Sequence, residues 1–261
     1  MNRVRDGSVT ILGLSQLRMC PPTSGVDSPA EGGRALAVAL HERGNTVILG
    51  GRRRDRLDEL TAAHPGLDAV VIDTADPESI RKAVAEVLDR RPDLDVLVAM
   101  AGIMKAEDRR TPEGFLSSAE DVVTTNVLGP IRLIAALVEH LRGRPGAAIL
   151  TVSSGPAFTP LAVTPSYTSK AAVRALTESL RLQLADTSIA VREIVPPAVR
   201  PLMPGHEDNE AGMPLDEYVA ETMALLEGGD REILVERVKP LRHSEVRGEY
   251  EQTVALLSGG H

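Results

Sequence analysis

The stretch T-V-S-S-G-P-A-F-T-P-L-A-V-T-P-S-Y-T-S-K, residues 151–170, places a hydroxyl, a phenol and an ammonium within seventeen residues. These groups belong to Ser154, Tyr167 and Lys170. A phenol is a poor acid at neutral pH, but an ammonium on the same helix face favours its phenolate. The pair can therefore exchange a proton with an alcohol or carbonyl while the hydroxyl holds the substrate oxygen. Because the stretch follows the apolar run Ala148 to Val152, it also marks a junction between a strand and a helix.

The spacing of Tyr167 and Lys170 is unusual for such a pair. If Tyr167 opens a helix, Lys170 lies three residues on, roughly 60° short of a full turn, whereas a fourth residue would lie about 40° past it. Both positions share a face with the tyrosine. The alternative interpretation is an ordinary loop-to-helix junction with a surface lysine.

Working outward from this junction, strand-like and helix-like segments alternate along the chain. The helical patterns lie between short runs rich in Val and Ile, which are typical of strands buried on both faces. The expected strands are Val9 to Leu12, Thr46 to Leu49, Ala69 to Ile72, Val96 to Ala99, Ala148 to Val152 and Ala190 to Val195. The expected helices include Gly33 to Arg43, Pro77 to Leu88 opened by Asp76, and Ala119 to Leu141. This order predicts an α/β fold in three layers, with a doubly wound parallel sheet of about seven strands.

The C-terminal part of the chain predicts a cover over the site and a last strand. A polar connection, residues 201–212, precedes a helical pattern from Met213 to Leu226, and residues 201–230 suit a substrate-side flap. Glu232 to Val235 is expected to form the seventh strand, and Glu245 to Leu257 a last helix.

Length and composition set limits on organisation and partners. With 261 residues and 43% hydrophobic composition, the chain can build one core, so a single domain over residues 1–261 is expected. The net charge is −8 and the longest basic cluster is Arg52 to Arg54 with Arg56, which disfavours nucleic acid binding. No apolar run suggests a membrane span or secretory signal, so a cytoplasmic location is expected. Cys20 has no partners at metal-ligand spacing, and no metal site is expected.

From about Gly33 to Tyr250, the sequence resembles the short-chain dehydrogenase/reductase family. The resemblance includes A-G-I-M-x-A-E-D after the fourth strand and the interval of thirteen residues from Ser154 to Tyr167. It implies a Rossmann-type sheet, NAD or NADP as cofactor, and hydride transfer assisted by a Ser, Tyr, Lys and Asn group. Asn126, in T-T-N-V-L-G-P, lies where the family's helix-borne Asn supports a water path to the lysine.

The resemblance also implies positions for the cofactor. Arg52 and Arg53 follow the second strand, where the family places basic residues for the 2′-phosphate of NADP, and a solvated charge run is the alternative. Asp73 matches the family's adenine contact, although an Asp at a strand end is also an ordinary cap of the next turn. Further cofactor contacts are expected after the fourth and sixth strands, at Ala101, Gly102 and Pro196.

The first loop departs most from the family. Residues 13–28 form an atypical insertion between the first strand and its helix, and the three-glycine phosphate fingerprint is absent. Ser28-Pro29-Ala30-Glu31 has the pattern of a capping box, which satisfies the helix start and places a carboxylate where a phosphate should lie. In the alternative, Thr23-Ser24-Gly25 and Gly32-Gly33 rebuild a phosphate cradle, with Gly25 as a cofactor contact.

Three smaller departures also affect the cofactor. The family's Asn-Asn-Ala-Gly is Ala99-Met100-Ala101-Gly102, its Pro-Gly and following Thr are Pro196-Pro197 and Pro201, and Y-x-x-x-K is Y-x-x-K. By contrast, Ser154, Tyr167 and Asn126, which handle the substrate oxygen and protons, are kept. The asymmetry indicates either a rebuilt cofactor site or chemistry that no longer needs the cofactor.

Three functions are compatible with these features. The first is an NADP(H)-dependent oxidoreductase that reduces a carbonyl or oxidises an alcohol on a small apolar substrate. The second is a cofactor-independent isomerase, cyclase or dehydratase that uses Tyr167 as acid or base. The third is a non-catalytic interaction subunit. In each case the apolar helix Val122 to Leu141 predicts a homodimer or homotetramer. The expected pocket lining comprises Met104, Phe158, Leu161, Val163, Leu202 and Met203.

Overall fold

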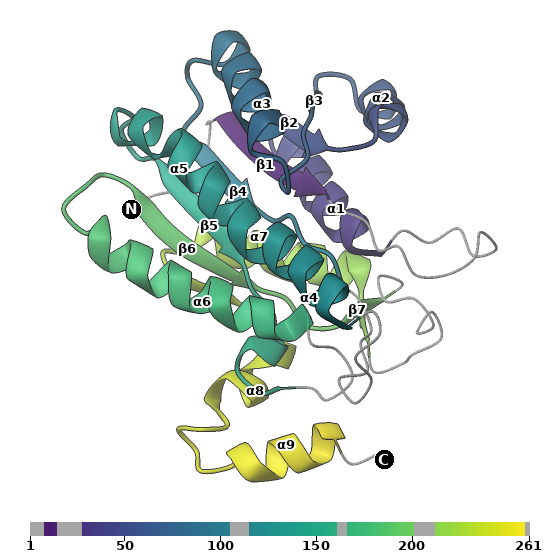
Figure 1. Ribbon diagram of the computed structural model, residues 1–261, viewed down its shortest axis with the longest axis vertical. Helices are drawn as coiled ribbons and strands as arrows, with labels where there is room; N and C mark the ends of the chain where they lie inside the picture. The colour runs from purple at the N-terminus through teal and green to yellow at the C-terminus, as the bar shows by residue number, and fades with distance from the viewer. Residues whose placement is uncertain (1–7, 15–27, 105–114, 161–165, 201–211, 259–261) are drawn as a thin grey trace.

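Seven parallel strands form a twisted sheet with helices on both faces (Figure 1). The computed structural model describes residues 8–14, 28–104, 115–160, 166–200 and 212–258. The strand order is β3-β2-β1-β4-β5-β6-β9, so the direction of winding reverses between β1 and β4. The strands are β1 Ser8–Leu14, β2 Thr46–Gly51, β3 Asp68–Val71, β4 Val96–Ala99, β5 Ala148–Val152, β6 Ala190–Val195 and β9 Glu232–Leu234. In such a sheet, ligands bind beyond the carboxyl ends of the strands near the reversal.

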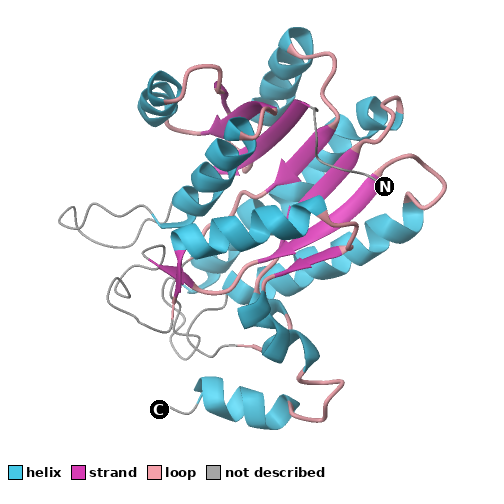
Figure 2. Ribbon diagram, turned by 180° about the vertical axis from the view of Figure 1, so that it is seen from behind, coloured by secondary structure: helices cyan, strands magenta, loops and turns pink. Residues whose placement is uncertain are grey.

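Two layers of helices cover the sheet. One face carries α1 (Ser28–Glu42) and α7 (Leu215–Glu227), which contact each other. This face is turned toward the viewer in Figure 2. The opposite face carries α3 (Pro77–Arg90), α5 (Gly129–Arg142) and α6 (Ser166–Gln183). The smaller elements are α2 Arg54–Ala63, β7 Val199–Arg200, β8 Met213–Pro214, α8 Lys239–His243 and α9 Tyr250–Ser258.

The hydrophobic core has two halves because successive side chains of a strand point to opposite faces. Val96 and Val98 of β4 pack into the half that lies under α1, whereas Leu97 packs into the half under α3 and α5. All four residues of β4 are buried. The near-continuous apolar strands seen in the sequence therefore follow from burial on both faces.

Polar side chains fix two helix ends. At the start of α3, the Asp76 carboxylate accepts the amide of Glu78 at 2.9 Å, and Pro77 occupies a first-turn position that needs no N–H partner. At the end of α7, the guanidinium of Arg192 donates to the carbonyls of Leu226 at 2.9 Å and Leu225 at 3.2 Å. Arg192 thereby ties the last turn of α7 to β6.

The predicted parallel sheet with helices on both sides is confirmed. The expected seventh strand is β9, at the edge beside β6. The last helix was predicted from Glu245, but α9 begins only at Tyr250, after a turn in which Gly248 has φ of 71°. Helices α2 and α8 were not predicted from the sequence. Of the predicted insertion 13–28, the first two residues belong to β1 and Ser28 begins α1; residues 15–27, and residues 201–211 of the predicted flap, lie outside the described residues.

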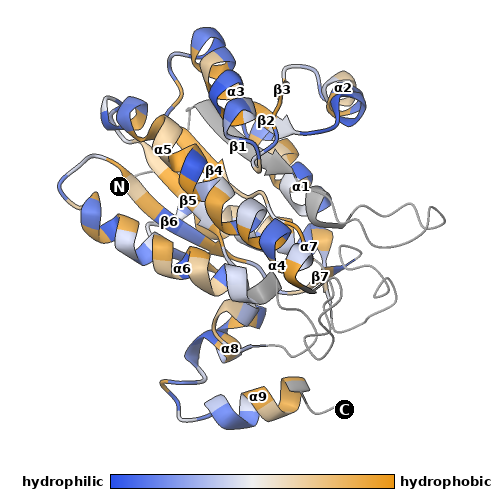
Figure 3. Ribbon diagram, in the orientation of Figure 1, coloured by the Kyte–Doolittle hydropathy of each residue, from blue (hydrophilic) through white to orange (hydrophobic). Residues whose placement is uncertain are grey.

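The long apolar helix is interrupted by one wide turn. The prediction Ala119 to Leu141 corresponds to α4 (Phe115–Val123), a π-helical turn η1 (Thr124–Leu128) and α5. By length and composition, Leu116–Arg142 could cross a membrane, whereas the sequence had predicted no membrane span. However, 44% of its most apolar 18-residue stretch is buried inside the protein, so packing on the sheet explains much of its hydropathy. Figure 3 shows the apolar residues along α5.

The apolar side chains of the predicted helix Val122 to Leu141 fall into two groups, one buried and one exposed. Leu137 and Leu141 are fully buried against the protein's own sheet. Val123 and Ile131 remain 48% and 38% exposed. Only the second group is accessible to a partner.

Candidate functional site

The candidate site lies at the carboxyl edge of the sheet, where three segments meet. They are the loop after β4, the π-helical turn η1, and the start of α6. A π-helical turn widens the helix locally, and such turns are frequent at functional sites. Here it carries Asn126.

Asn126 is buried and uses its whole amide group. Its Oδ1 accepts the amide of Ile103 at 2.7 Å, and its Nδ2 donates to the carbonyl of Ile103 at 2.8 Å. The same Nδ2 donates to the hydroxyl of Ser169 at 2.9 Å. Asn126 therefore fixes the backbone just after Gly102 and joins it to the first turn of α6.

Lys170 lies in the same cluster. Its Nζ donates to the carbonyl of Val152 at 2.8 Å, at the end of β5. A Cβ added to Gly102 would lie 3.4 Å from Lys170 Nζ and 3.5 Å from Asn126 Oδ1, so both polar groups face that glycine. Burial lowers the pKa of Lys170 to about 8. A lysine that exchanges its proton near neutral pH is suited to proton transfer.

Ser154 lies directly beyond β5 in an extended conformation and is half-buried. The next residue, Gly155, donates its amide to the carbonyl of Pro196 at 3.2 Å, and Ser153 donates its amide to Ile194 at 3.0 Å. These bonds bring the predicted residues Ser154 and Pro196 into adjoining loops. A one-turn 3-10 helix, η2 (Gly155–Ala157), follows.

Tyr167 lies in the first turn of α6, three residues before Lys170. Its side chain is outside the described part of the structure, so its distance from Lys170 stays a prediction. The residue one full turn before Lys170 is Ser166. The shortened spacing therefore shifts the phenol by one position relative to the lysine that the cluster holds.

The predicted cofactor residues lie at the ends of neighbouring strands. Arg52 is exposed, and Arg53 is the half-buried residue that precedes α2. Two guanidinium groups at the end of β2 fit an anionic group such as a 2′-phosphate. Asp73 accepts the amide of Ala75 at 2.9 Å through Oδ1, which matches the alternative interpretation of a turn cap.

Two further predicted cofactor positions lie in the loop after β4. Ala101 is 2% exposed, and Gly102 brings its backbone close to Lys170 and Asn126. A glycine there allows the backbone to approach a bound group closely. Gly25 lies outside the described residues, as do Leu161, Val163, Leu202 and Met203 of the expected pocket lining.

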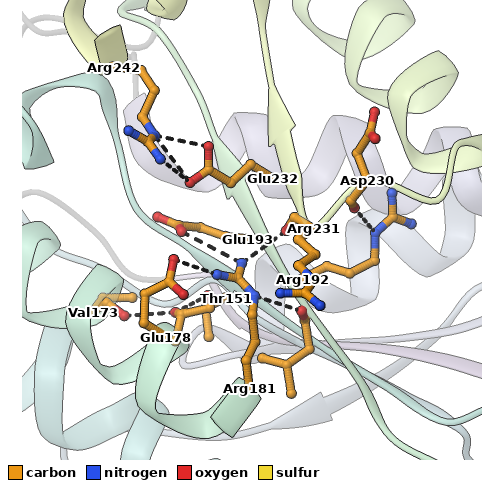
Figure 4. Close-up of polar contacts among 12 residues, drawn as sticks. Thr151, Val173, Glu178, Arg181, Arg192, Glu193, Asp230, Arg231, Glu232 and Arg242 are labelled. Carbon is orange, nitrogen blue, oxygen red and sulfur yellow. Dashed lines mark hydrogen bonds and ion pairs between the residues drawn. The ribbon is translucent and has the colours of Figure 1, made fainter. Parts of the chain in front are cut away.

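A partly buried ionic network joins α6, β6 and β9 next to the residue that precedes Ser154 (Figure 4). One carboxylate oxygen from each of Glu178, Glu193 and Glu232 lies within 4.8 Å of the others. At that distance two carboxylates repel by roughly 3 kcal/mol at an effective dielectric constant of 20, so cations must balance them. Arg181 lies 2.7 Å from Glu178 and 3.9 Å from Glu193, and Arg242 binds Glu232 through both carboxylate oxygens.

Glu193 has the least favourable surroundings in this network. Its side chain is fully buried, and neither carboxylate oxygen has a hydrogen-bond partner among the described residues. Burial raises the pKa of Glu193, and the nearby Ser153 hydroxyl opposes that shift. Glu193 thus places the network close to Ser153, the residue that precedes Ser154.

Sequence reasoning missed Ser169 and the ionic network. Ser169 could have been singled out from the sequence, because it directly precedes Lys170 in the same motif. The sequence gives no indication that the three glutamates meet, because Glu178, Glu193 and Glu232 come from three separate elements. Only the register of β6 against β9, which places Glu193 opposite Glu232, brings two of them together.

A doubly wound sheet with a polar cluster at the carboxyl edge, near the reversal of strand order, defines an α/β protein of the dinucleotide-binding type. The chain belongs to the short chain dehydrogenase family, which it matches over residues 31–211. This finding confirms the family and the oxidoreductase class that the sequence motifs indicated.

Individual relatives support the same assignment. The chain is 39% identical over 229 residues to the uncharacterized oxidoreductase DltE of Bacillus subtilis, a match that covers 84% of this chain and 89% of the relative. It is 30% identical to an NADPH-dependent 1-acyldihydroxyacetone phosphate reductase of Schizosaccharomyces pombe, over 62% of this chain and 54% of the relative. A short chain dehydrogenase from Burkholderia cenocepacia, solved in complex with NADP, has the same fold, with a TM-score of 0.77, 22% identity and 98% coverage of both chains.

Proposed function

We propose that this protein is an NADP(H)-dependent oxidoreductase that reduces a carbonyl, or oxidises the corresponding alcohol, on a small apolar substrate. The observation that carries the proposal is the cluster in which Lys170 Nζ and Asn126 Oδ1 face Gly102 at the carboxyl edge of the sheet. Its lysine has a pKa of about 8, which suits proton exchange at physiological pH.

NADP(H) would be held between the end of β2 and the cluster and would supply the hydride. Arg52 and Arg53 are the residues that would hold its 2′-phosphate, because a guanidinium pairs well with phosphate oxygens. The NADPH-dependent reductase of Schizosaccharomyces pombe and the Burkholderia cenocepacia structure with NADP support this choice over NAD. Gly102 and Pro196 would contact the reactive end of the cofactor.

The protein's own side chains would handle the substrate oxygen and its proton. Tyr167 protonates the carbonyl oxygen as the alcohol forms, and Ser154 orients that oxygen by a hydrogen bond. Lys170, in its ammonium form, stabilises the phenolate left behind. Asn126 holds the loop after β4 and the first turn of α6 in place, which keeps Lys170 beside Gly102.

Assembly into a homodimer or homotetramer is part of the proposal. Four apolar side chains of the α4 to α5 helix are between 38% and 64% exposed in the single chain. These residues are Leu116, Val123, Leu128 and Ile131. Contact with a second copy would cover them.

Replacing Tyr167 with phenylalanine tests the proposed chemistry. The Tyr167→Phe variant is expected to lose about 10²–10⁴-fold in kcat, because general acid catalysis contributes that much, while it still binds NADPH. The measurement is NADPH oxidation with a panel of small apolar aldehydes and ketones.

The double variant Ser166→Tyr with Tyr167→Phe is the matched control for this test. It restores a phenol one full turn before Lys170, and recovery of turnover would assign the loss to the missing phenol. Full activity of Tyr167→Phe alone would contradict the proposed role. Failure of the wild-type protein to oxidise NADPH with any carbonyl, together with isomerisation or dehydration of an added substrate, would favour the cofactor-independent alternative.

A further inference from the structure

We propose that Arg242, in the short helix α8, is a positioning residue that holds the Ser154 loop in its active conformation. The inference rests on the proposed function insofar as Ser154 orients the substrate oxygen. Arg242 touches neither Ser154 nor the proposed cofactor residues in the described contacts. It acts through Phe158, which lies four residues after Ser154, and through the segment that packs on Gly155.

The first link is the ring of Phe158. The guanidinium carbons of Arg174 and Arg242 lie over this ring, at 4.8 Å and 5.0 Å from its centroid. Both distances are within the range of a cation–π interaction. Arg174 comes from α6 and Arg242 from α8, so the ring joins the Ser154 loop to two separate helices.

The second link fixes the guanidinium itself. Arg242 Nε lies 2.9 Å from Glu232 Oε2, and Arg242 Nη2 lies 3.0 Å from Glu232 Oε1. This paired geometry orients the planar group as a single donor could not. Glu232 lies in the edge strand β9, opposite Glu193 of β6, so the orientation of Arg242 is tied to the sheet (Figure 4).

The third link is steric contact at Gly155. A Cβ added to Gly155 would lie 2.8 Å from Leu241 Cδ1 and 3.3 Å from Val238 Cγ1. The backbone that follows Ser154 therefore packs directly on the segment that carries Arg242. A Cβ at position 155 would require at least the end of the Leu241 side chain to shift.

Together these contacts hold the loop in place at two positions after Ser154, namely Gly155 and Phe158. Gly155 is held by Val238, Leu241 and the carbonyl of Pro196, and Phe158 is held by the two guanidinium groups. Loss of the Arg242 guanidinium removes one cation from Phe158 and leaves Glu232 without its bidentate partner. We expect the loop to open more often, and the Ser154 hydroxyl to lose its fixed position.

Hydrogen exchange of the loop amides tests this inference without any need for a substrate. The amides of Ala157 and Phe158 donate to the carbonyls of Ser154 and Gly155, each at 3.0 Å, and they exchange when the loop opens. In Arg242→Met, which keeps an apolar stem, they are expected to exchange about ten-fold faster than in the wild-type protein. Phe158→Leu should give the same direction of change, and Arg242→Lys, which keeps the cation, a smaller one.

A control and a kinetic measurement separate positioning from general destabilisation. Arg237→Met removes an exposed guanidinium from the preceding turn and should leave loop exchange unchanged. With a reducible carbonyl, Arg242→Met should lower kcat about ten-fold, because Ser154 is less well placed, while the dissociation constant for NADPH stays the same.

Wild-type loop exchange in both Arg242→Met and Phe158→Leu would overturn the inference. If Arg242→Met does not unfold cooperatively, Phe158→Leu alone decides, and unchanged exchange in that variant overturns the inference. If the wild-type protein reduces no carbonyl, the proposed function fails, but the exchange result still decides whether Arg242 holds the loop.

Discussion

Replacing Lys170 with methionine is expected to slow carbonyl reduction strongly and to make the protein more stable near pH 7. Methionine matches the length of the apolar stem of lysine but removes the amino group that faces Gly102 and Asn126. Turnover should fall by about 10²-fold or more, because the phenolate of Tyr167 would lose the cation that favours it. Stability should rise because a partly desolvated ammonium is replaced by an apolar group.

The pH dependence of this effect follows from the lysine pKa. Burial lowers the pKa of Lys170 from 10.5 to about 8, so between these values the unfolded chain binds more protons than the folded protein. The free energy of unfolding of the wild-type protein therefore gains a contribution that rises from about pH 8 to about pH 10.5. The cost of the buried ammonium is fully present below pH 8 and disappears above 10.5.

Denaturant unfolding of both proteins across this pH range measures the effect. The stability advantage of Lys170→Met should shrink as the pH rises from 8 to 10.5. Lys82→Met is the matched control, because the Lys82 side chain is 70% exposed on α3, and it should change neither turnover nor the pH profile. A constant difference in stability between Lys170→Met and the wild-type protein would contradict the depressed pKa.

Replacing Asn126 with leucine is expected to cause a large loss of stability together with loss of turnover. The amide of Asn126 satisfies the N–H and C=O of Ile103 and the hydroxyl of Ser169, and all three bonds disappear in Asn126→Leu. A buried polar group left without a partner costs about 1–3 kcal/mol, so we expect about 3 kcal/mol or more in total. The loop after β4 should also move away from Lys170.

A second buried asparagine far from the site provides the control for Asn126→Leu. Asn45 is 4% exposed and donates to the carbonyl of Leu40 at 2.9 Å. Asn45→Leu should lower the unfolding midpoint in urea but leave kcat near the wild-type value. Full turnover in Asn126→Leu at temperatures where it remains folded would show that Asn126 has no part in arranging the site.

The fold could be predicted from the sequence because its strands are buried on both faces. Continuous apolar runs such as Ala148 to Val152 admit few other interpretations once helical patterns separate them. The segments that were missed have weaker signals. Helix α2 begins in the basic run after Gly51 and buries only Leu57 and Leu60, and α8 is a short helix with no fully buried residue.

The candidate site was predicted mainly from Ser154, Tyr167 and Lys170, which lie close together in the sequence. The structure places Lys170 with Asn126 and Gly102, although the shortened Y-x-x-K spacing made the lysine the least expected member of the group. A one-residue change in spacing can displace either partner. The packing of α6 on η1 keeps Lys170 beside the loop after β4, whereas the Tyr167 side chain lies outside the described part of the structure. The contacts of Arg242 and Glu193 depend on strand register, which the sequence pattern does not determine.

Calorimetric titration of the wild-type protein with NADPH tests the central claim most directly. We expect saturable binding of NADPH with a dissociation constant in the micromolar range. The dissociation constant for NADH should be larger by about ten-fold or more, because NADH lacks the phosphate that Arg52 and Arg53 would receive. Binding must also tolerate the atypical loop between β1 and α1. Absence of any heat of binding at millimolar NADPH would contradict the proposed function and leave a short chain dehydrogenase fold that works without its dinucleotide.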